Sequence, residues 1–232
     1  MNALLARVPL LRKLPPAALE TLAPACEVQR FRKGQVIFEE GQRAEAVWIV
    51  TRGWIFLLKK NPQGAPVTIF AMTPAEPICG ISAFDEGGYS ATAVAATETQ
   101  LLRIPAKTFA KLLERYPDFA KHVLMICCQR IRRMAEAISL AQAPVLQRIA
   151  YTLLRLSRAF GKTVPMTHHE LASMVGTRWE TSIRTLSAMK RRGWVASSRR
   201  RITILSPHKL ENLLGTNGKS KRPTPNGSAR PN

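Results

Sequence analysis

The sequence predicts an α+β fold in which an antiparallel, jelly-roll-like β-roll is followed by a long helix and a winged helix–turn–helix. Three observations support it. Residues 27–105 hold short apolar runs of period two, separated by turn residues. Residues 118–142 have a helical period. Residues 167–205 contain two helix-period segments separated by Gly176, followed by two short β-like runs.

This order divides the chain into four parts. We expect a β-roll domain over residues 1–117, a long helix and hinge over 118–143, a winged helix–turn–helix over 144–214 and a disordered basic tail over 215–232. The tail is polar and low in complexity, which is typical of disorder. A length of 232 residues and an apolar share of 46% are sufficient for buried cores.

Short helices are expected over residues 2–24, with the Pro15-Pro16 pair at a helix start. Strands are expected at Val36–Phe38, Val47–Val50, Trp54–Leu58, Val67–Phe70 and Leu101–Ile104. Glycine-containing turns separate them, for example at Gly34, Gly41 and Gly53. Many short strands at this spacing indicate a β-sandwich or β-roll.

The long helix is expected from Asp118 to about Gln142, ahead of a hinge at Pro144. Apolar or small residues recur along it at heptad spacing, with one further residue a step before them: Val123, Cys127, Ile131, Met134, Ile138 and Ala141. Such a seam packs either on its own domain or against the same helix of a second copy. We favour the second arrangement, a parallel homodimer.

The helix–turn–helix begins at a capping box formed by Thr167 and Glu170. Its second helix covers residues 178–192 and carries Glu180 and Arg184 four residues apart, on one face near the helix start. A hairpin turn with three arginines, Arg199–Arg201, separates the two β-like runs that follow.

The net charge of +20 is concentrated in the C-terminal part. Residues 144–232 hold 17 Lys and Arg against 3 Asp and Glu, whereas residues 1–143 hold 18 against 12. An imbalance this one-sided is typical of proteins that bind a polyanion. We therefore expect double-stranded DNA as a partner.

In a major groove, an arginine can donate two hydrogen bonds to guanine and a glutamate can accept one from cytosine. Glu180 and Arg184 are thus expected to read G·C pairs, although they would also fit an ordinary surface ion pair. Phosphate contacts are expected from Thr167, Lys190, Arg191, Arg192, Arg199, Arg200 and Arg201. These contacts would raise affinity without selecting sequence, and the alternative for the cations is a solvated surface.

Over roughly residues 10–212 the chain resembles the Crp/Fnr superfamily of bacterial transcription regulators. The match is strongest in VGTRWETSIRTLSAMKRRGWV, where Glu180 and Arg184 stand at the Glu and Arg positions of the recognition helix. Trp179 stands where the family has a third base-reading residue, and Arg178 is the neighbouring side chain that could compensate. The resemblance implies a homodimer that binds an inverted-repeat DNA site and contacts RNA polymerase.

The effector pocket departs from the cyclic-AMP-binding relatives, in which a Glu holds the ribose and an Arg-Ser pair meets the phosphate. When the segment ICGISAFDEGGYS is aligned on Phe84, these positions are Gly80, Tyr89 and Ser90, so only the Ser is kept. Without the cation, the phosphate would be uncompensated in a partly desolvated pocket. The resemblance therefore implies a degenerate pocket that cyclic AMP does not control.

Other modes of control stay open. Cys79 falls where heme-based relatives have a thiolate ligand, but their neighbouring histidine is Ile81 here; His122 is the other candidate heme ligand. A redox bridge could involve Cys127, with Cys128 beside it. A regulator controlled by its own abundance is a further alternative. Apart from heme, no cofactor and no metal is expected, and an iron–sulfur cluster would need more N-terminal cysteines.

The same sequence argues against other protein classes. It shows no secretory signal, and its cysteines are typical of a reduced, cytoplasmic protein. No apolar run approaches the ~20 residues of a membrane-spanning helix. No P-loop, dinucleotide fingerprint or nucleophile elbow is present, and the His168-His169 pair lacks acidic or cysteine partners for a metal. We expect that the protein is not an enzyme.

Overall fold

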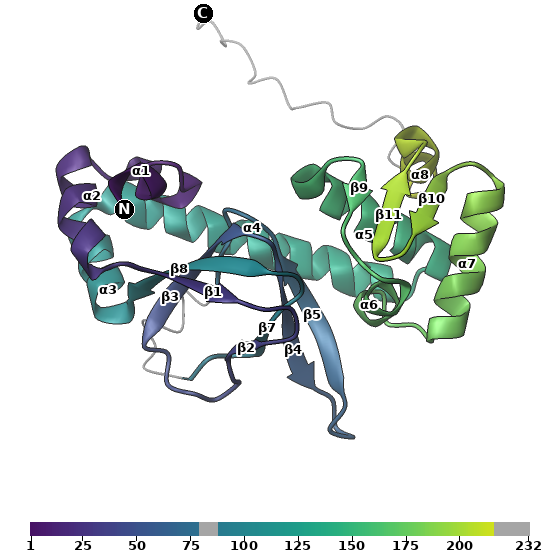
Figure 1. Ribbon diagram of the computed structural model, residues 1–232, viewed down its shortest axis with the longest axis horizontal. Coiled ribbons are helices and arrows are strands. Elements are labelled where there is room, and N and C mark those ends of the chain that lie inside the picture. The colour runs from purple at the N-terminus through teal and green to yellow at the C-terminus, as the bar shows by residue number, and fades with distance from the viewer. Residues whose placement is uncertain (79–87, 216–232) are drawn as a thin grey trace, which may run out of the picture.

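The structure is a computed structural model that describes residues 1–78 and 88–215. Cys79, Gly80 and nearly all of the expected tail lie outside the described residues. Figure 1 shows a β-sheet domain and a smaller mixed domain, joined by one long helix that runs behind the sheets. The predicted α+β fold class is confirmed.

Four short helices precede the sheets: α1 (Asn2–Leu5), η1 (Pro9–Lys13), α2 (Pro16–Leu22) and η2 (Ala23–Ala25). Helix α2 begins at Pro16 as predicted, because a proline at the first helical position has no N–H to leave unpaired. Leu5, Leu11, Phe109 and Phe119 join these helices to α3 and α4 in one buried cluster. The N-terminal helices thus cover one end of the β-roll.

In the described residues, the β-roll consists of two four-stranded antiparallel sheets. One sheet has the order β1-β8-β3-β6, with β1 (Glu27–Phe31), β8 (Thr99–Pro105), β3 (Ala46–Arg52) and β6 (Pro77–Ile78). The other has the order β2-β7-β4-β5, with β2 (Val36–Phe38), β7 (Thr92–Ala95), β4 (Ile55–Lys60) and β5 (Pro66–Met72). Val50 and Leu101 from the first sheet pack with Phe38, Ile55 and Leu57 from the second.

All five predicted strands are present, and three further strands were missed. Strand β1 has the sequence EVQRF, whose partly exposed residues give little apolar signal. Strand β7 is TAVA, and its Ala93 and Ala95 are buried although alanine is not a typical strand residue. Strand β6 has only two residues, one of them a proline at the edge of its sheet.

The helical part begins with α3 (Ala106–Arg115) and α4 (Pro117–Ala141), so the long helix starts one residue earlier than predicted. The winged domain that follows comprises α5 (Val145–Phe160), β9 (Thr163–Val164), α6 (His168–Met174), α7 (Trp179–Arg191), β10 (Val195–Ser198), β11 (Arg201–Ile204) and α8 (Pro207–Leu213). Its three strands form a sheet of order β10-β11-β9.

The exposed apolar residues of α4 differ from the predicted seam at one position. Val123 packs against the buried N-terminal cluster, so the prediction that it faces a partner is wrong. Leu124 is 63% exposed instead, and it lies three residues before Cys127, as heptad alternation requires. Ile131 and Ile138 are 64% and 71% exposed.

The two domains pack directly on each other. The ring of Trp54 on the β-roll meets that of Phe160 on α5 edge to face, with centroids 5.7 Å apart. Gly53 forms the turn just before Trp54. Its φ of +75° favours glycine, and any Cβ at this position would lie 2.4 Å from the carbonyl oxygen of Glu98, which is too close. Lys33 forms an ion pair of 2.6 Å with Glu170 of α6. The winged domain is therefore held against the β-roll at several points.

Candidate nucleic-acid interface

Helices α6 and α7 form the predicted helix–turn–helix. The capping box is confirmed: Thr167 Oγ1 accepts a hydrogen bond of 3.1 Å from the Glu170 backbone N–H, and Glu170 Oε2 accepts one of 2.7 Å from the Thr167 N–H. The turn contains Gly176 at φ +61°, a left-handed conformation that favours glycine. The capping box fixes the start of α6, and Gly176 allows the chain to turn before α7.

One face of α7 is buried and the opposite face is open to solvent. Ser182, Leu186 and Met189 are buried on the inner face. The outer face carries exposed side chains at helical spacing: Glu180, Arg184, Ser187 and Arg191. Ser187 was missed by the sequence analysis, because a serine has no charge to mark it.

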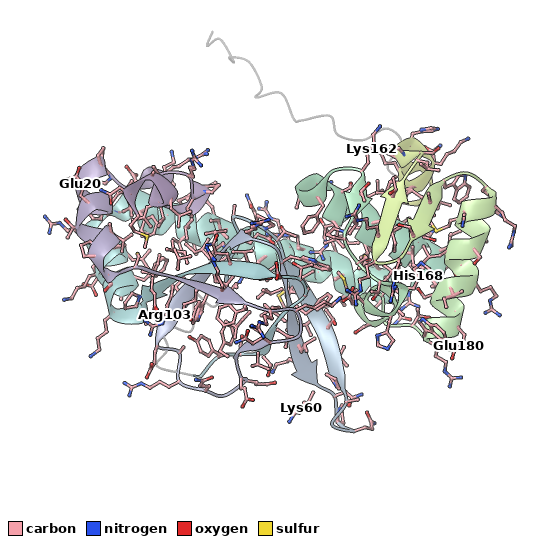
Figure 2. The ribbon with its side chains drawn as sticks, in the orientation of Figure 1. Glu20, Lys60, Arg103, Lys162, His168 and Glu180 are labelled. Atoms are coloured by element: carbon pink, nitrogen blue, oxygen red, sulfur yellow. The ribbon has the colours of Figure 1, made fainter. Side chains whose placement is uncertain are left out.

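Glu180 and Arg184 are both exposed, and within the described part of the chain neither forms an ion pair or a side-chain hydrogen bond. The surface ion pair considered as their alternative role is therefore not seen. Figure 2 places Glu180 near the start of α7, at the opposite end of the molecule from Glu20. Trp179 beside it is 49% exposed, and Arg178 is the exposed N-cap residue of the same helix.

A second residue that the sequence analysis missed holds the turn in place. Arg148 of α5 donates hydrogen bonds from one guanidinium nitrogen to the carbonyl oxygens of Val175, at 2.7 Å, and Gly176, at 3.2 Å. Carbonyls at a helix end lack partners within the helix, so Arg148 satisfies the end of α6. No local sequence pattern links Arg148 to a turn that lies 27 residues away.

The cations expected to meet phosphates are at the end of α7 and on the β10–β11 hairpin. Lys190, Arg191 and Arg192 are exposed, although the Arg192 guanidinium also lies 4.9 Å from the centre of the Trp194 ring. Arg199 and Arg200 form the hairpin turn, with Arg200 in the left-handed region at φ +61°. The prediction that Arg201 also lies in this turn is wrong, because it is the first residue of β11.

The position expected to bind a nucleotide phosphate is filled by a core aromatic residue. Tyr89 is only 4% exposed, and its ring stacks on Phe38 at 3.8 Å. Its hydroxyl donates to the Ala46 carbonyl at 3.2 Å and accepts from Trp48 Nε1 at 3.1 Å. Ser90 is exposed, while Gly80 and Phe84 lie outside the described residues.

The described cysteines differ in their environments. Burial raises the pKa of the Cys26 thiol to about 11. Burial also raises the pKa of Cys127, which is half-buried, whereas Cys128 is exposed. His122 is half-buried on α4. Across residues 1–78 and 88–215, no three His, Cys, Asp or Glu residues are grouped so that they could hold a metal, and no bilayer-spanning helix is found.

Comparison with known proteins relates both halves of the chain to one family. Residues 28–116 match the cyclic nucleotide-binding domain and residues 147–213 match the Crp-like helix–turn–helix domain. The chain is 31% identical over 189 residues to the cyclic AMP receptor protein of Thermus thermophilus, and this alignment covers 81% of this chain and 88% of that relative. It is 24% identical over 219 residues to the CRP-like cAMP-activated global transcriptional regulator of Mycobacterium tuberculosis, covering 90% of this chain and 98% of the relative.

The solved structures show the same architecture. FixK2 from Bradyrhizobium japonicum superposes with a TM-score of 0.74 over 81% of this chain and 96% of its own, at 21% sequence identity. The fold, the helix–turn–helix and the identity to the Thermus relative lead to the same family. The chain belongs to the Crp/Fnr family of transcription regulators and carries its DNA-binding helix–turn–helix.

Proposed function

We propose that the protein is a homodimeric, sequence-specific regulator that binds an inverted-repeat DNA site through helix α7 of each protomer. The observation that carries this proposal is the outer face of α7, where Glu180 and Arg184 are exposed and have no partner among the described side chains. Their hydrogen-bonding groups are therefore free for base edges. The regulator would act in the cytoplasm, where it would also contact RNA polymerase.

Different residues around this pair would contact bases and phosphates. Arg184 would donate to guanine and Glu180 would accept from cytosine. Arg178 and Trp179 lie at the helix start, next to the bases flanking this contact. Lys190, Arg191 and Arg192, the hairpin cations Arg199, Arg200 and Arg201, and the Thr167 hydroxyl would meet phosphates, which position the protein without reading sequence.

The exposed apolar stripe of α4 supports the homodimer. After the correction at position 124, the seam consists of Leu124, Cys127, Ile131, Met134, Ile138 and Ala141. A contiguous stripe of exposed apolar residues on a water-facing helix typically marks an interface. Pairing of the seam in parallel with a second copy would give the dimer two α7 helices, and binding of half-sites one turn of DNA apart requires these helices to lie roughly 34 Å apart.

Tyr89 supports independence from cyclic AMP. Two relatives are named for cyclic AMP, but here the expected phosphate position holds a buried phenol ring rather than a cation. Titration calorimetry of the full-length protein with cyclic AMP should show no binding. Binding that strengthens DNA affinity would contradict this part of the proposal.

Control by abundance is the second candidate for regulation, and the filled position at Tyr89 favours it. The heme alternative depends on Cys79, which lies outside the described residues, and on His122. An absorption spectrum of the purified protein tests it directly, because a bound heme gives a Soret band.

Selection of bound sites from random DNA tests the main proposal. The wild-type protein should select inverted repeats with half-sites centred about 10 base pairs apart. Arg184→Ala and Glu180→Ala should each select sites in which one symmetric pair of positions is no longer fixed. Arg12→Ala removes an exposed arginine from η1 and is the matched control, which should select the wild-type sites. Unchanged selection by both α7 variants would contradict the assignment.

A further inference from the structure

A cavity lies at the junction of the two domains, outside the surfaces described above. It has a volume of about 570 Å³ and lies between the β5–β6 loop, α4 and α5. Its lining includes six ionisable side chains: Glu76, Arg132, Arg133, Glu136, Arg155 and Arg158. Four arginines thus face two carboxylates, so the lining carries a surplus of positive charge.

Both carboxylates are already bound to other groups. Glu76 Oε1 pairs with Arg133 at 2.5 Å, and its Oε2 accepts hydrogen bonds from the Thr73 backbone N–H at 2.7 Å and the Thr73 hydroxyl at 3.0 Å. Glu136 Oε2 accepts a hydrogen bond of 2.8 Å from the Tyr151 hydroxyl. Among the carboxylates of residues 1–78 and 88–215, none forms an ion pair with the other three arginines of the cavity, Arg132, Arg155 and Arg158.

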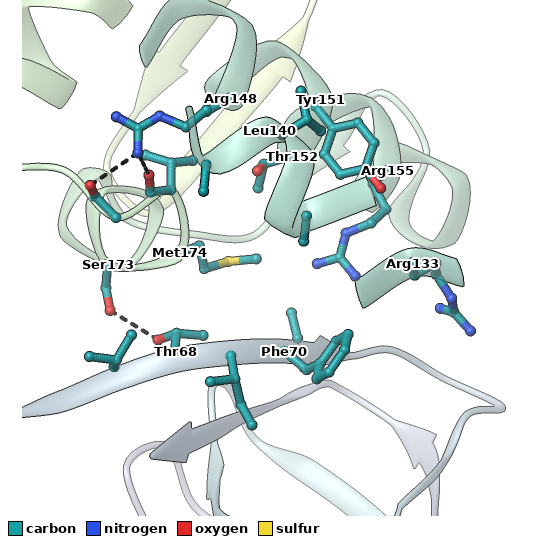
Figure 3. A pocket seen from close by; sticks show the side chains of 17 residues that line it. Thr68, Phe70, Arg133, Leu140, Arg148, Tyr151, Thr152, Arg155, Ser173 and Met174 are labelled. Carbon is teal, nitrogen blue, oxygen red and sulfur yellow. Dashed lines mark hydrogen bonds between the residues drawn. The ribbon is translucent and has the colours of Figure 1, made fainter. Parts of the chain in front are cut away.

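Arg155 is the innermost of these three. It also lines a neighbouring cavity of about 260 Å³, and Figure 3 shows it extending from α5 toward Phe70 on β5. Burial lowers its pKa, an effect that nearby Glu76 opposes. Within the described residues, no group accepts a hydrogen bond from its guanidinium. A partly desolvated guanidinium without an acceptor is costly, and its planar fork fits one carboxylate or phosphoryl group with two hydrogen bonds.

Arg132 and Arg158 are exposed at the rim of the cavity. They come from α4 and α5, so a ligand held by Arg155 and by both rim arginines would contact the helices on either side of the Pro144 hinge. The cavity-lining residues of α4 lie on the side of that helix opposite the seam, because they occupy the b, c and f positions when Leu124 is a and Cys127 is d. The proposed dimer would leave the cavity open.

We propose that this cavity binds a small dianion through Arg155, with Arg132 and Arg158 contacting its second charge. Of the nucleotide-type pocket, the described positions Tyr89 and Ser90 do not line this cavity. A dianion bound to both helices would favour one angle at the hinge, and would thereby act on the orientation of α7. The binding itself does not rest on the proposed DNA function, whereas this regulatory consequence does.

Titration calorimetry of the full-length protein, at constant ionic strength and without DNA, tests the site. The probes are inorganic phosphate and succinate at about pH 8, where both are mainly dianions, and they separate phosphoryl from carboxylate recognition. At least one of them should bind once per protomer. Arg155→Gln should weaken that binding by about tenfold or more, because hydrogen bonds to charged groups are lost. Arg158→Gln changes an exposed residue and should weaken binding several-fold, whereas Arg12→Gln should leave it unchanged.

Two results would overturn the proposal. One is the absence of binding by both probes to the wild-type protein. The other is binding that is lost in Arg200→Ala and kept in Arg155→Gln and Arg158→Gln, since the anion would then occupy the proposed DNA-binding surface. Because no DNA is present, failure of the DNA proposal would not change the outcome.

Discussion

Replacement of Ile138 by alanine tests the proposed dimer seam on α4. The Ile138 side chain is 71% exposed in the single chain, so most of its apolar surface is available to a partner. Full burial of an isoleucine contributes about 2 kcal/mol, so burying the exposed part contributes about 1.5 kcal/mol, of which alanine would keep about a third. Two protomers change in each dimer, and the expected loss is about 2 kcal/mol, a roughly 30-fold weaker dimer.

Sedimentation equilibrium over a range of concentrations measures this dissociation constant directly. Met125→Ala is the matched control, since Met125 is 52% exposed on the same helix but lies outside the seam. It should leave the dimer unchanged. An unaltered dissociation constant for Ile138→Ala, or equal weakening by Met125→Ala, would refute the assignment of the seam.

Three further predictions concern the turn, the wing and the core. Arg148→Met removes both hydrogen bonds to the turn carbonyls of Val175 and Gly176. Because the turn positions α7, the variant should bind DNA about tenfold more weakly, as measured by fluorescence anisotropy. Wild-type affinity would contradict the role given to Arg148. Arg200→Ala should weaken binding to all DNA sequences alike. It should also reduce the slope of log affinity against log salt by about 0.9, the value for one phosphate contact. A loss of affinity that depends on the DNA sequence would instead indicate a base contact. Burial raises the folded-state pKa of Cys26 from 9.0 to about 11, so its contribution to stability is fully present below pH 9 and is lost as the pH rises toward 11. Thermal unfolding in this range should show less pH dependence for Cys26→Ala, and identical curves would contradict this reasoning.

Local sequence periodicity predicted much of the fold. The apolar run Val67–Phe70 marked β5, and the Thr167–Glu170 capping box marked the start of α6, because both depend on neighbouring residues. Strands β1 and β7 were missed because their burial depends on partners far along the chain, β8 and β2 respectively. Val123 was added to the seam by a step of four residues that breaks the 3–4 alternation, and its side chain packs against the N-terminal cluster instead.

The candidate site shows the same division between local and long-range information. Glu180 and Arg184 could be placed on one face of α7 from their spacing alone. Arg148 could not be connected to the turn, because its bonds to Val175 and Gly176 arise only when α5 packs on α6. No sequence pattern identified Arg155 as a binding residue either, because the residues around it come from α4, α5 and the β5–β6 loop.

The central claim is that the outer face of α7 reads base pairs. Its most direct test compares wild-type and Arg184→Ala affinities for the preferred site and for sites in which a single G·C pair is changed, at one fixed salt concentration. The account predicts that the wild-type protein loses about 1–3 kcal/mol at one symmetric position and that Arg184→Ala no longer distinguishes the bases there. If the variant binds every site more weakly but keeps the full wild-type discrimination at each position, Arg184 contacts only the phosphate backbone and the claim is contradicted.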